Sequence, residues 1–224
     1  DRVVWATSMV ACGDADGAVT GNTRRFGASL DKIKQVVDVR DGEIMFGLNM
    51  VVHKGKTIFV GDTSVHEYPT SEQMAEIAIS TARVVRLFGF EPKVAFVSHS
   101  TFGQPLTSRT RHIRKAVDIL KEQKVDFEFD GDMQPDVALD SEYKELYPFS
   151  NIVGKANILI MPGQHSAAIS YKMMKTLGDT KVIGPLLIGL GLPIEIAPLR
   201  SSTSELINLA SIAAYSADVI DYKK

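Results

Sequence analysis

GPLLIGLGLPIEIAPLRSSTSELINLASIAAYSA spans residues 184–217 and reads as a strand, a turn and a helix. The apolar run 194–196 is typical of a short buried strand, and Pro198 follows it. Ser202 with Glu205 three residues later fits the capping box, in which each side chain bonds the backbone N–H of the other. A helix is therefore predicted after Ser202, with apolar residues at helical spacing at Leu206, Leu209, Ala210, Ala213 and Ala217.

The start of this helix is also a candidate anion site. Backbone N–H groups at a helix N-terminus can hold a phosphate or a carboxylate. Arg200 adds a positive charge just upstream, and two hydroxyls follow it. We predict that Arg200, Ser201 and Ser202 contribute to such a site.

The same stretch resembles the end of a phosphate acetyltransferase (phosphotransacetylase) domain, whose members carry G-P-x-x-x-G-x-x-x-P, then D-L-S-R-G-C and an Asp. The first motif is matched by Gly184, Pro185, Gly189 and Pro193. Aligned without a gap, the family's catalytic Ser falls on Pro198, its Arg on Leu199 and its Asp on Glu205. The resemblance therefore implies that this chain keeps the glycines and prolines of the motif but lacks its reactive side chains. Glu205 has an alternative role as the capping-box Glu.

This combination resembles the C-terminal part of the bacterial hybrid NADP-dependent malic enzymes, in which a phosphotransacetylase-like domain behind the malic domain senses acetyl-CoA. The resemblance implies that acetyl-CoA is an effector and that this chain has no catalytic residue or cofactor of its own. NADP and a divalent metal would belong only to a malic domain in cis, outside these residues. The opening, DRVVWATSMVACGDADG, reads as mid-domain sequence, so we expect an absent N-terminal portion.

Composition sets broad limits on partners and compartment. The chain has 224 residues, 45% of them hydrophobic and 23% charged, with a formal net charge of -2. Such a charge gives no general attraction to nucleic acid or to an anionic membrane. Cys12, the single cysteine, excludes an internal disulfide, and no signal peptide or membrane-spanning run is visible. These features favour the cytoplasm.

Strand and helix patterns alternate along the chain and predict an α/β fold. Helices are expected over residues 3–12, 23–37, 70–88, 107–123 and 165–177, and a helix within SEYKELYPFS. Strands are expected over residues 18–20, 93–97, 125–129 and 158–161, and a hairpin over 43–61. The resemblance implies two lobes, like those of isocitrate and isopropylmalate dehydrogenases, with a ligand cleft between them. The first lobe would hold residues 1–47 and 184–224, and the second residues 48–183.

Further segments match the family and supply candidate ligand residues. Thr23-Arg24-Arg25-Phe26 fits a T-R-x-aromatic run of the hybrid enzymes, so Arg24 and Arg25 are expected to bind phosphate or the CoA 3′-phosphate, or alternatively to form a surface salt bridge. The SHSTFG loop after the strand 93–97 fits the family's S-x-S-T-K-G. Its expected ligand residues are Ser98, Ser100, Thr101 and Gly103, while Phe102 takes the Lys place. The alternative for this loop is a turn that caps the next helix.

The loop PGQHSAA fits the family's P-D-L-N-A-G-N, so His165 replaces an Asn and is a further candidate contact. Thr176 replaces an Arg that the family keeps. Asp130, Gln134 and Asp136 lack a His at metal-ligand spacing, so turn or capping roles are favoured over a metal site. The sequence has no P-loop, dinucleotide fingerprint or zinc-protease motif.

Three functions remain open at this stage. The first is a regulatory and oligomerising domain of a malic enzyme, which binds acetyl-CoA or a related CoA ester and is itself inactive. The second is a working phosphate acetyltransferase, which converts acetyl-CoA and phosphate to acetyl phosphate and CoA. The third is a ligand-free dimerisation domain.

Overall fold

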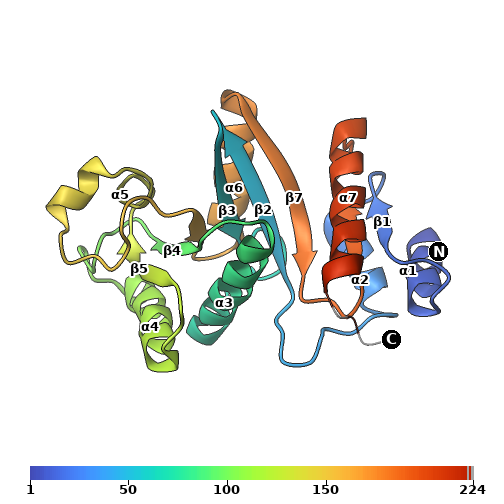
Figure 1. Cartoon of the computed structure of the whole chain (residues 1–224), viewed down its shortest axis with the longest axis horizontal. Helices are drawn as coiled ribbons and strands as arrows, with labels where there is room; N and C mark the ends of the chain where they lie inside the picture. The colour runs from blue at the N-terminus through green and yellow to red at the C-terminus, as the bar shows by residue number, and fades with distance from the viewer. Residues whose placement is uncertain (221, 223–224) are drawn as a thin grey trace. The chain divides into compact units, whose positions relative to one another are not determined.

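The computed structural model describes residues 1–220 and Tyr222 (Figure 1). The chain forms two compact units, which are described separately below. The first is Asp1–Asn49 with Ile183–Lys224, and the second is Met50–Val182. The divisions fall inside two long strands, β2 (Phe46–His53) and β7 (Thr180–Ile188).

The first unit places helices around a pair of short parallel strands. β1 (Ala18–Gly21) pairs with β8 (Ile194–Ala197) in the register Ala18↔Ile194 to Gly21↔Ala197. Helices α1 (Arg2–Ala11), α2 (Phe26–Ile33) and α7 (Thr203–Val219) all contact this pair. Because all four β8 side chains are buried, this pair forms the centre of the unit.

The second unit contains most of a six-stranded sheet, in the order β5-β4-β6-β3-β2-β7. β3 (Lys56–Gly61), β6 (Ile158–Ile160), β4 (Lys93–Val97) and β5 (Glu128–Met133) pair in parallel. The expected hairpin is confirmed, since β2 and β3 are neighbours joined at Lys54 and Gly55, which both have positive φ as a two-residue type I′ turn requires.

Helices complete the second unit: α3 (Ser71–Leu87), α4 (Ser108–Gln123), α5 (Pro135–Leu139), the 3₁₀ helix η1 (Glu142–Leu146) and α6 (Gln164–Leu177). α3 and α4 lie side by side in Figure 1 and pack against each other. α3 agrees with the helix expected over residues 70–88, because Thr70 and Gln73 form a capping box at its start and Met74, Ile77 and Val85 are buried.

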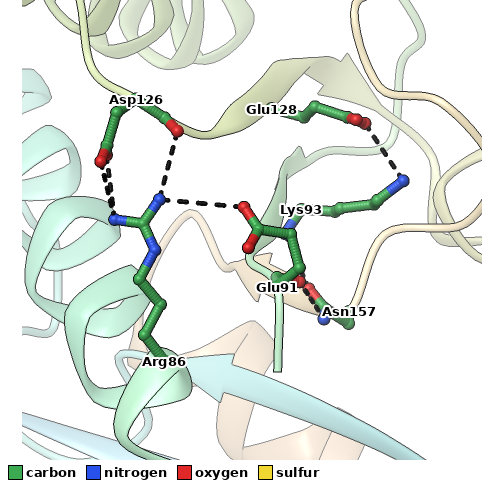
Figure 2. A network of polar contacts seen from close by, with 6 residues as sticks. All are labelled: Arg86, Glu91, Lys93, Asp126, Glu128 and Asn157. Carbon is green, nitrogen blue, oxygen red and sulfur yellow. Dashed lines mark hydrogen bonds and ion pairs between the residues drawn. The ribbon is translucent and has the colours of Figure 1, made fainter. Parts of the chain in front are cut away.

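A polar network lies at the amino-terminal ends of β4, β5 and β6 (Figure 2). The loop 98–103, which was predicted to bind ligand, leaves the opposite end of β4. Arg86, at the end of α3, donates to both carboxylate oxygens of Asp126 at 3.0 Å, just before β5. Lys93, at the start of β4, lies 3.4 Å from the Glu128 carboxylate, and its backbone N–H donates to the Asn157 side chain. This network joins the carboxyl end of α3 to the amino-terminal ends of β4, β5 and β6.

The structure corrects four details of the predicted secondary structure. The helix expected over 23–37 covers only Phe26–Ile33, because residues 22–25 form a loop held against β8. The strand expected over 125–129 runs instead from Glu128 to Met133, in register with β4. The SEYKELYPFS helix is a short 3₁₀ turn, and β7 is a strand that was not predicted.

No helix in residues 1–220 is both long and apolar enough to cross a membrane. Within the same described residues, no group of three or more His, Cys, Asp or Glu side chains is arranged to hold a metal ion.

Candidate functional site

In the first unit, the two predicted arginine segments come together at the carboxyl ends of β1 and β8. These strands are parallel, so the loops 22–25 and 198–202 leave from the same edge. Asn22 joins them through its backbone, because its N–H donates to the Ala197 carbonyl at 2.9 Å and its carbonyl accepts from the Arg200 N–H at 3.0 Å. The fold thus brings the backbones of Arg24, Arg25, Arg200, Ser201 and Ser202 to one strand edge.

The arginines of this edge have different surroundings. The Arg24 guanidinium lies 2.6 Å from the Asp1 carboxylate, which also caps α1 by accepting from the Val3 N–H. Arg24 therefore has the surface salt bridge that was the alternative to a ligand contact. Arg25 precedes α2 without a side-chain capping bond, and its side chain is exposed. Arg200 is exposed and has a left-handed backbone with φ of 60°.

The hydroxyls near Arg200 are engaged locally. Ser201 Oγ donates to the Pro198 carbonyl at 2.9 Å. Ser202 and Glu205 form the predicted capping box, in which Glu205 Oε2 accepts from the Ser202 N–H at 2.7 Å and Ser202 Oγ accepts from the Glu205 N–H at 3.3 Å. Glu205 therefore acts as a helix cap at the position that aligns with the family's Asp.

Pro198 and Leu199, the positions that align with the family's Ser and Arg, bring no polar side chain to this edge. Leu199 is 53% exposed at the same loop. A proline or leucine side chain can neither donate a proton nor neutralise a phosphate. Neither side chain at this strand end can therefore act as a polar donor or hold a phosphate.

In the second unit, the hydroxyl loop after β4 is fastened to the end of β5. Ser100 Oγ donates to the Asp132 carboxylate, and Ser98 Oγ lies 3.3 Å from Ser100 Oγ. The same carboxylate accepts from the Gly103 N–H at 3.0 Å, and Thr101 Oγ1 accepts from the Gln134 N–H at 3.2 Å.

All of these loop side chains are buried, so the hydroxyls of Ser98, Ser100 and Thr101 brace the loop in this structure. The alternative, a cap for the next helix, is wrong, because Thr107 caps α4. Asp132 was not singled out from the sequence. Phe102 has a positive φ and packs on Phe149, with ring centroids 4.8 Å apart.

His165 and Thr176 lie on α6, also in the second unit. His165 Nε2 is 3.7 Å from the Glu67 carboxylate, and its ring is parallel to that of Tyr68 at 6.5 Å. Thr176 is exposed in the last turn of the helix. Asp136 accepts the backbone N–H of its neighbour Val137, and Asp130 accepts those of Gly131 and of the more distant Asn151.

One buried carboxyl was not singled out from the sequence. Glu195 lies on β8 with 4% of its surface exposed, and its Oε2 accepts from the Leu187 N–H at 2.9 Å. Burial raises the pKa of Glu195 to about 8, because the ionised form has lost its hydration. The first unit thus holds a carboxyl that is protonated over much of the neutral range.

The fold and its strand-end loops define a protein of the phosphotransacetylase type. The phosphate acetyl/butaryl transferase family model matches residues 1–214, and the chain belongs to this family. Its structure is similar to a phosphotransacetylase from Streptococcus pyogenes, with a TM-score of 0.90 and 29% identity over 97% of this chain and 68% of that one. It is also similar to the EutD phosphotransacetylase from Staphylococcus aureus, with a TM-score of 0.84 and 27% identity over 96% of this chain and 67% of that one.

Among full-length sequences, the chain is similar to the NADP-dependent malic enzyme of Rhizobium meliloti, with 46% identity over 97% of this chain and 28% of that protein. It is 33% identical to the phosphate acetyltransferase of Clostridium acetobutylicum over 97% of this chain and 68% of that protein. The chain therefore spans less than a third of the malic enzyme relative. The predicted α/β phosphotransacetylase fold and the predicted kinship to malic enzymes are confirmed.

Proposed function

We propose that this chain is a regulatory domain of an NADP-dependent malic enzyme of the cytoplasm, which binds acetyl-CoA or a related CoA ester as an effector and is catalytically inactive. The malic domain in cis would carry out the oxidative decarboxylation of malate to pyruvate with NADP and a divalent metal. Binding of the effector would shift that domain between states of different activity. Such a shift requires tighter binding to one state, and typical couplings are about 1–3 kcal/mol.

One observation carries the proposal: the reactive positions of the family are occupied by Pro198 and Leu199 at the end of an otherwise intact strand, loop and helix. β8, the loop 198–202 and the capped helix α7 are all present. Loss of a single positioned donor commonly lowers turnover by about 10²–10³-fold. The loss of two such groups supports a domain that keeps the fold around the site and binds a ligand, but no longer transfers an acetyl group.

The test combines a binding assay with an activity assay on the purified chain. Thermal unfolding is followed over a concentration series of acetyl-CoA, and thiol release is followed with acetyl-CoA and phosphate present. We expect the midpoint to rise with ligand concentration, as it does when a ligand binds only the folded state. We also expect no thiol release above the enzyme-free rate, whereas phosphate-dependent release would overturn the inactive assignment.

The family match keeps an active phosphate acetyltransferase as the second candidate, because relatives with that name align with 97% of the chain. In that case the chain would transfer an acetyl group between CoA and phosphate by way of other residues. The thiol-release assay separates the two candidates directly. A Pro198→Ser, Leu199→Arg double variant is the matched comparison, since it restores the family's residue types at both positions.

The oligomerising part of the proposal is supported by an exposed apolar stripe on α6. Ile169, Met173 and Leu177 recur every four residues and are 57%, 54% and 81% exposed. Apolar side chains at this spacing share one helix face, which is typical of a contact surface. Light scattering should show a smaller particle for an Ile169→Glu, Leu177→Glu variant, and an unchanged mass would exclude this face.

If acetyl-CoA causes no thermal shift, a ligand-free dimerisation domain becomes the better description.

A further inference from the structure

The second unit contains a pocket of about 370 Å³ that none of the predicted site residues lines. It lies where the loop before α3, the first turns of α4 and the segment after β6 meet. Its main lining residues are Tyr68, Pro69, Arg109, His112, Ile113 and Pro162. A pocket of this volume with mainly apolar walls and few polar groups is typical of small-ligand sites. We refer to it as the Arg109 pocket.

The wall of this pocket is held in place by His112. The ring Nε2 lies 2.8 Å from the Pro69 carbonyl, which can only accept, so this nitrogen donates. The Ser71 hydroxyl lies 3.0 Å from the ring Nδ1 and 2.8 Å from the His112 carbonyl, and its one proton can be donated to either. These contacts join α4 to the start of α3 and hold His112 as a fixed wall.

The rim carries an aromatic ring and a positive charge. Tyr68 is 62% exposed, and the Arg109 guanidinium lies 5.5 Å from the centre of its ring. Among the side chains that the structure describes, no carboxylate pairs with Arg109. The nearby Glu67 carboxylate lies instead 3.7 Å from His165. Arg109 is therefore available to an anionic ligand, and its planar group already lies over an aromatic face.

Another pocket, of about 380 Å³, is less suited to an anion. Arg114 and Lys121 line it, but so do the Asp118 and Asp130 carboxylates. Lys121 is already paired with Asp118 at 3.2 Å. Those two acidic groups would repel a phosphate, whereas the lining of the Arg109 pocket includes no acidic residue.

We propose that the Arg109 pocket binds the nucleotide end of the CoA ester, with the adenine against Tyr68 and the apolar walls and a phosphate on Arg109. This inference rests on the proposed function, because it names the group of the effector that this part of the chain recognises. An aromatic base stacks on tyrosine and on guanidinium planes, and arginine matches phosphate oxygens with two parallel hydrogen bonds. The apolar volume and the unpaired charge together fit a flat base that carries a phosphate.

The experiment measures dissociation constants by calorimetry for wild type and for Tyr68→Ala, Arg109→Ala and Arg111→Ala. Arg111 is the matched control, because it is an exposed arginine on the same helix and does not line the pocket. Three probes are used: acetyl-CoA, its 3′-dephospho form and acetyl-pantetheine, which lacks the nucleotide. Circular dichroism and the unfolding midpoint of each variant establish that it is folded.

We expect Tyr68→Ala and Arg109→Ala to weaken acetyl-CoA binding by about 10- to 100-fold, the range for loss of a charge-assisted contact. We expect Arg111→Ala to bind like wild type, and acetyl-pantetheine binding to be the same in all four proteins. If wild type binds no CoA ester, the proposed function and this inference fail together. If wild type binds but the pocket variants match Arg111→Ala, or lose acetyl-pantetheine equally, only this inference is overturned.

Discussion

Ser100 donates a hydrogen bond to the Asp132 carboxylate, and both side chains are fully buried. This bond joins the loop after β4 to the end of β5. The carboxylate also accepts from the Gly103 N–H, so one acidic group organises the loop 98–103. The loop SHSTFG is therefore held in place by Asp132, which lies on β5 and outside the loop.

Asp132→Asn should destabilise the chain by about 2 kcal/mol, because the new amide N–H₂ would face the N–H and O–H donors that the carboxylate now accepts. Urea denaturation at neutral pH measures the difference. Asp118→Asn is the control, since Asp118 is exposed on α4 and such surface changes commonly stay within about 0.5 kcal/mol. Equal stability of the two variants would show that Asp132 does not organise the loop.

Glu195 should make stability fall as pH rises through the neutral range. The folded-state pKa of about 8 lies above the ordinary glutamate value of about 4.3, so the folded chain holds an additional proton between these pH values. The stabilisation is present below about pH 4 and is lost progressively up to about pH 8.

Glu195→Gln removes this titration and keeps an oxygen to accept from the Leu187 N–H. Denaturation from pH 5 to 9 should show the variant gaining on wild type with rising pH, by about 4 kcal/mol over this range. Glu142→Gln, at the surface of η1, should run parallel to wild type. A constant difference between the Glu195→Gln and wild-type curves would mean that Glu195 is ionised throughout.

Ser202→Ala should cost about 1 kcal/mol, because it removes the N-cap of α7. Ser204→Ala changes an exposed residue in the first turn of the same helix and should be nearly neutral. Thermal and chemical denaturation of the pair measure the contrast. If the two changes cost the same, the capping box does not determine the start of α7.

Arg86→Ala should raise the pKa of Asp126, which the hydrogen bond from Arg86 holds below its usual range. Carboxyl NMR titration follows this change. Lys115→Ala is the reciprocal variant: the Glu72 pKa, lowered to about 2 by the hydrogen bond from Lys115, should rise, while that of Asp126 stays unchanged. Movement of both carboxyls in either variant would indicate a general structural change in place of two local pairs.

The parts of the fold that depend on interactions between neighbouring residues, such as helix starts, could be predicted from the sequence. The starts of α3 and α7 were predicted correctly, because each begins with a capping box that lies within four residues of the chain. β7 was missed because it contains Gly184 and Pro185, and these residue types ordinarily argue against a strand. β5 was placed too early because Asp130 was assigned a turn or capping role and Asp132 was not considered. The burial of these two carboxylates is tolerated through partners far along the chain, Asn151 and Ser100.

The candidate site was predicted to a similar extent. The residues after β1 and β8 were recognised in separate stretches, and parallel pairing brings their backbones to one edge. The partners of individual side chains were not visible, because the Arg24 contact with Asp1 and the Ser100 contact with Asp132 depend on tertiary folding. Tyr68 and Arg109 were not recognised, since neither lies in a motif and only the folded chain brings them together.

The two backbone hydrogen bonds of Asn22 couple the loops 22–25 and 198–202, which are far apart in sequence, so that they move together. The amides of Asn22 and Arg200 should then exchange with deuterium at one shared opening rate, because neither loop can swing away while the other stays. A ligand that touches either arginine-bearing loop would consequently slow exchange in both.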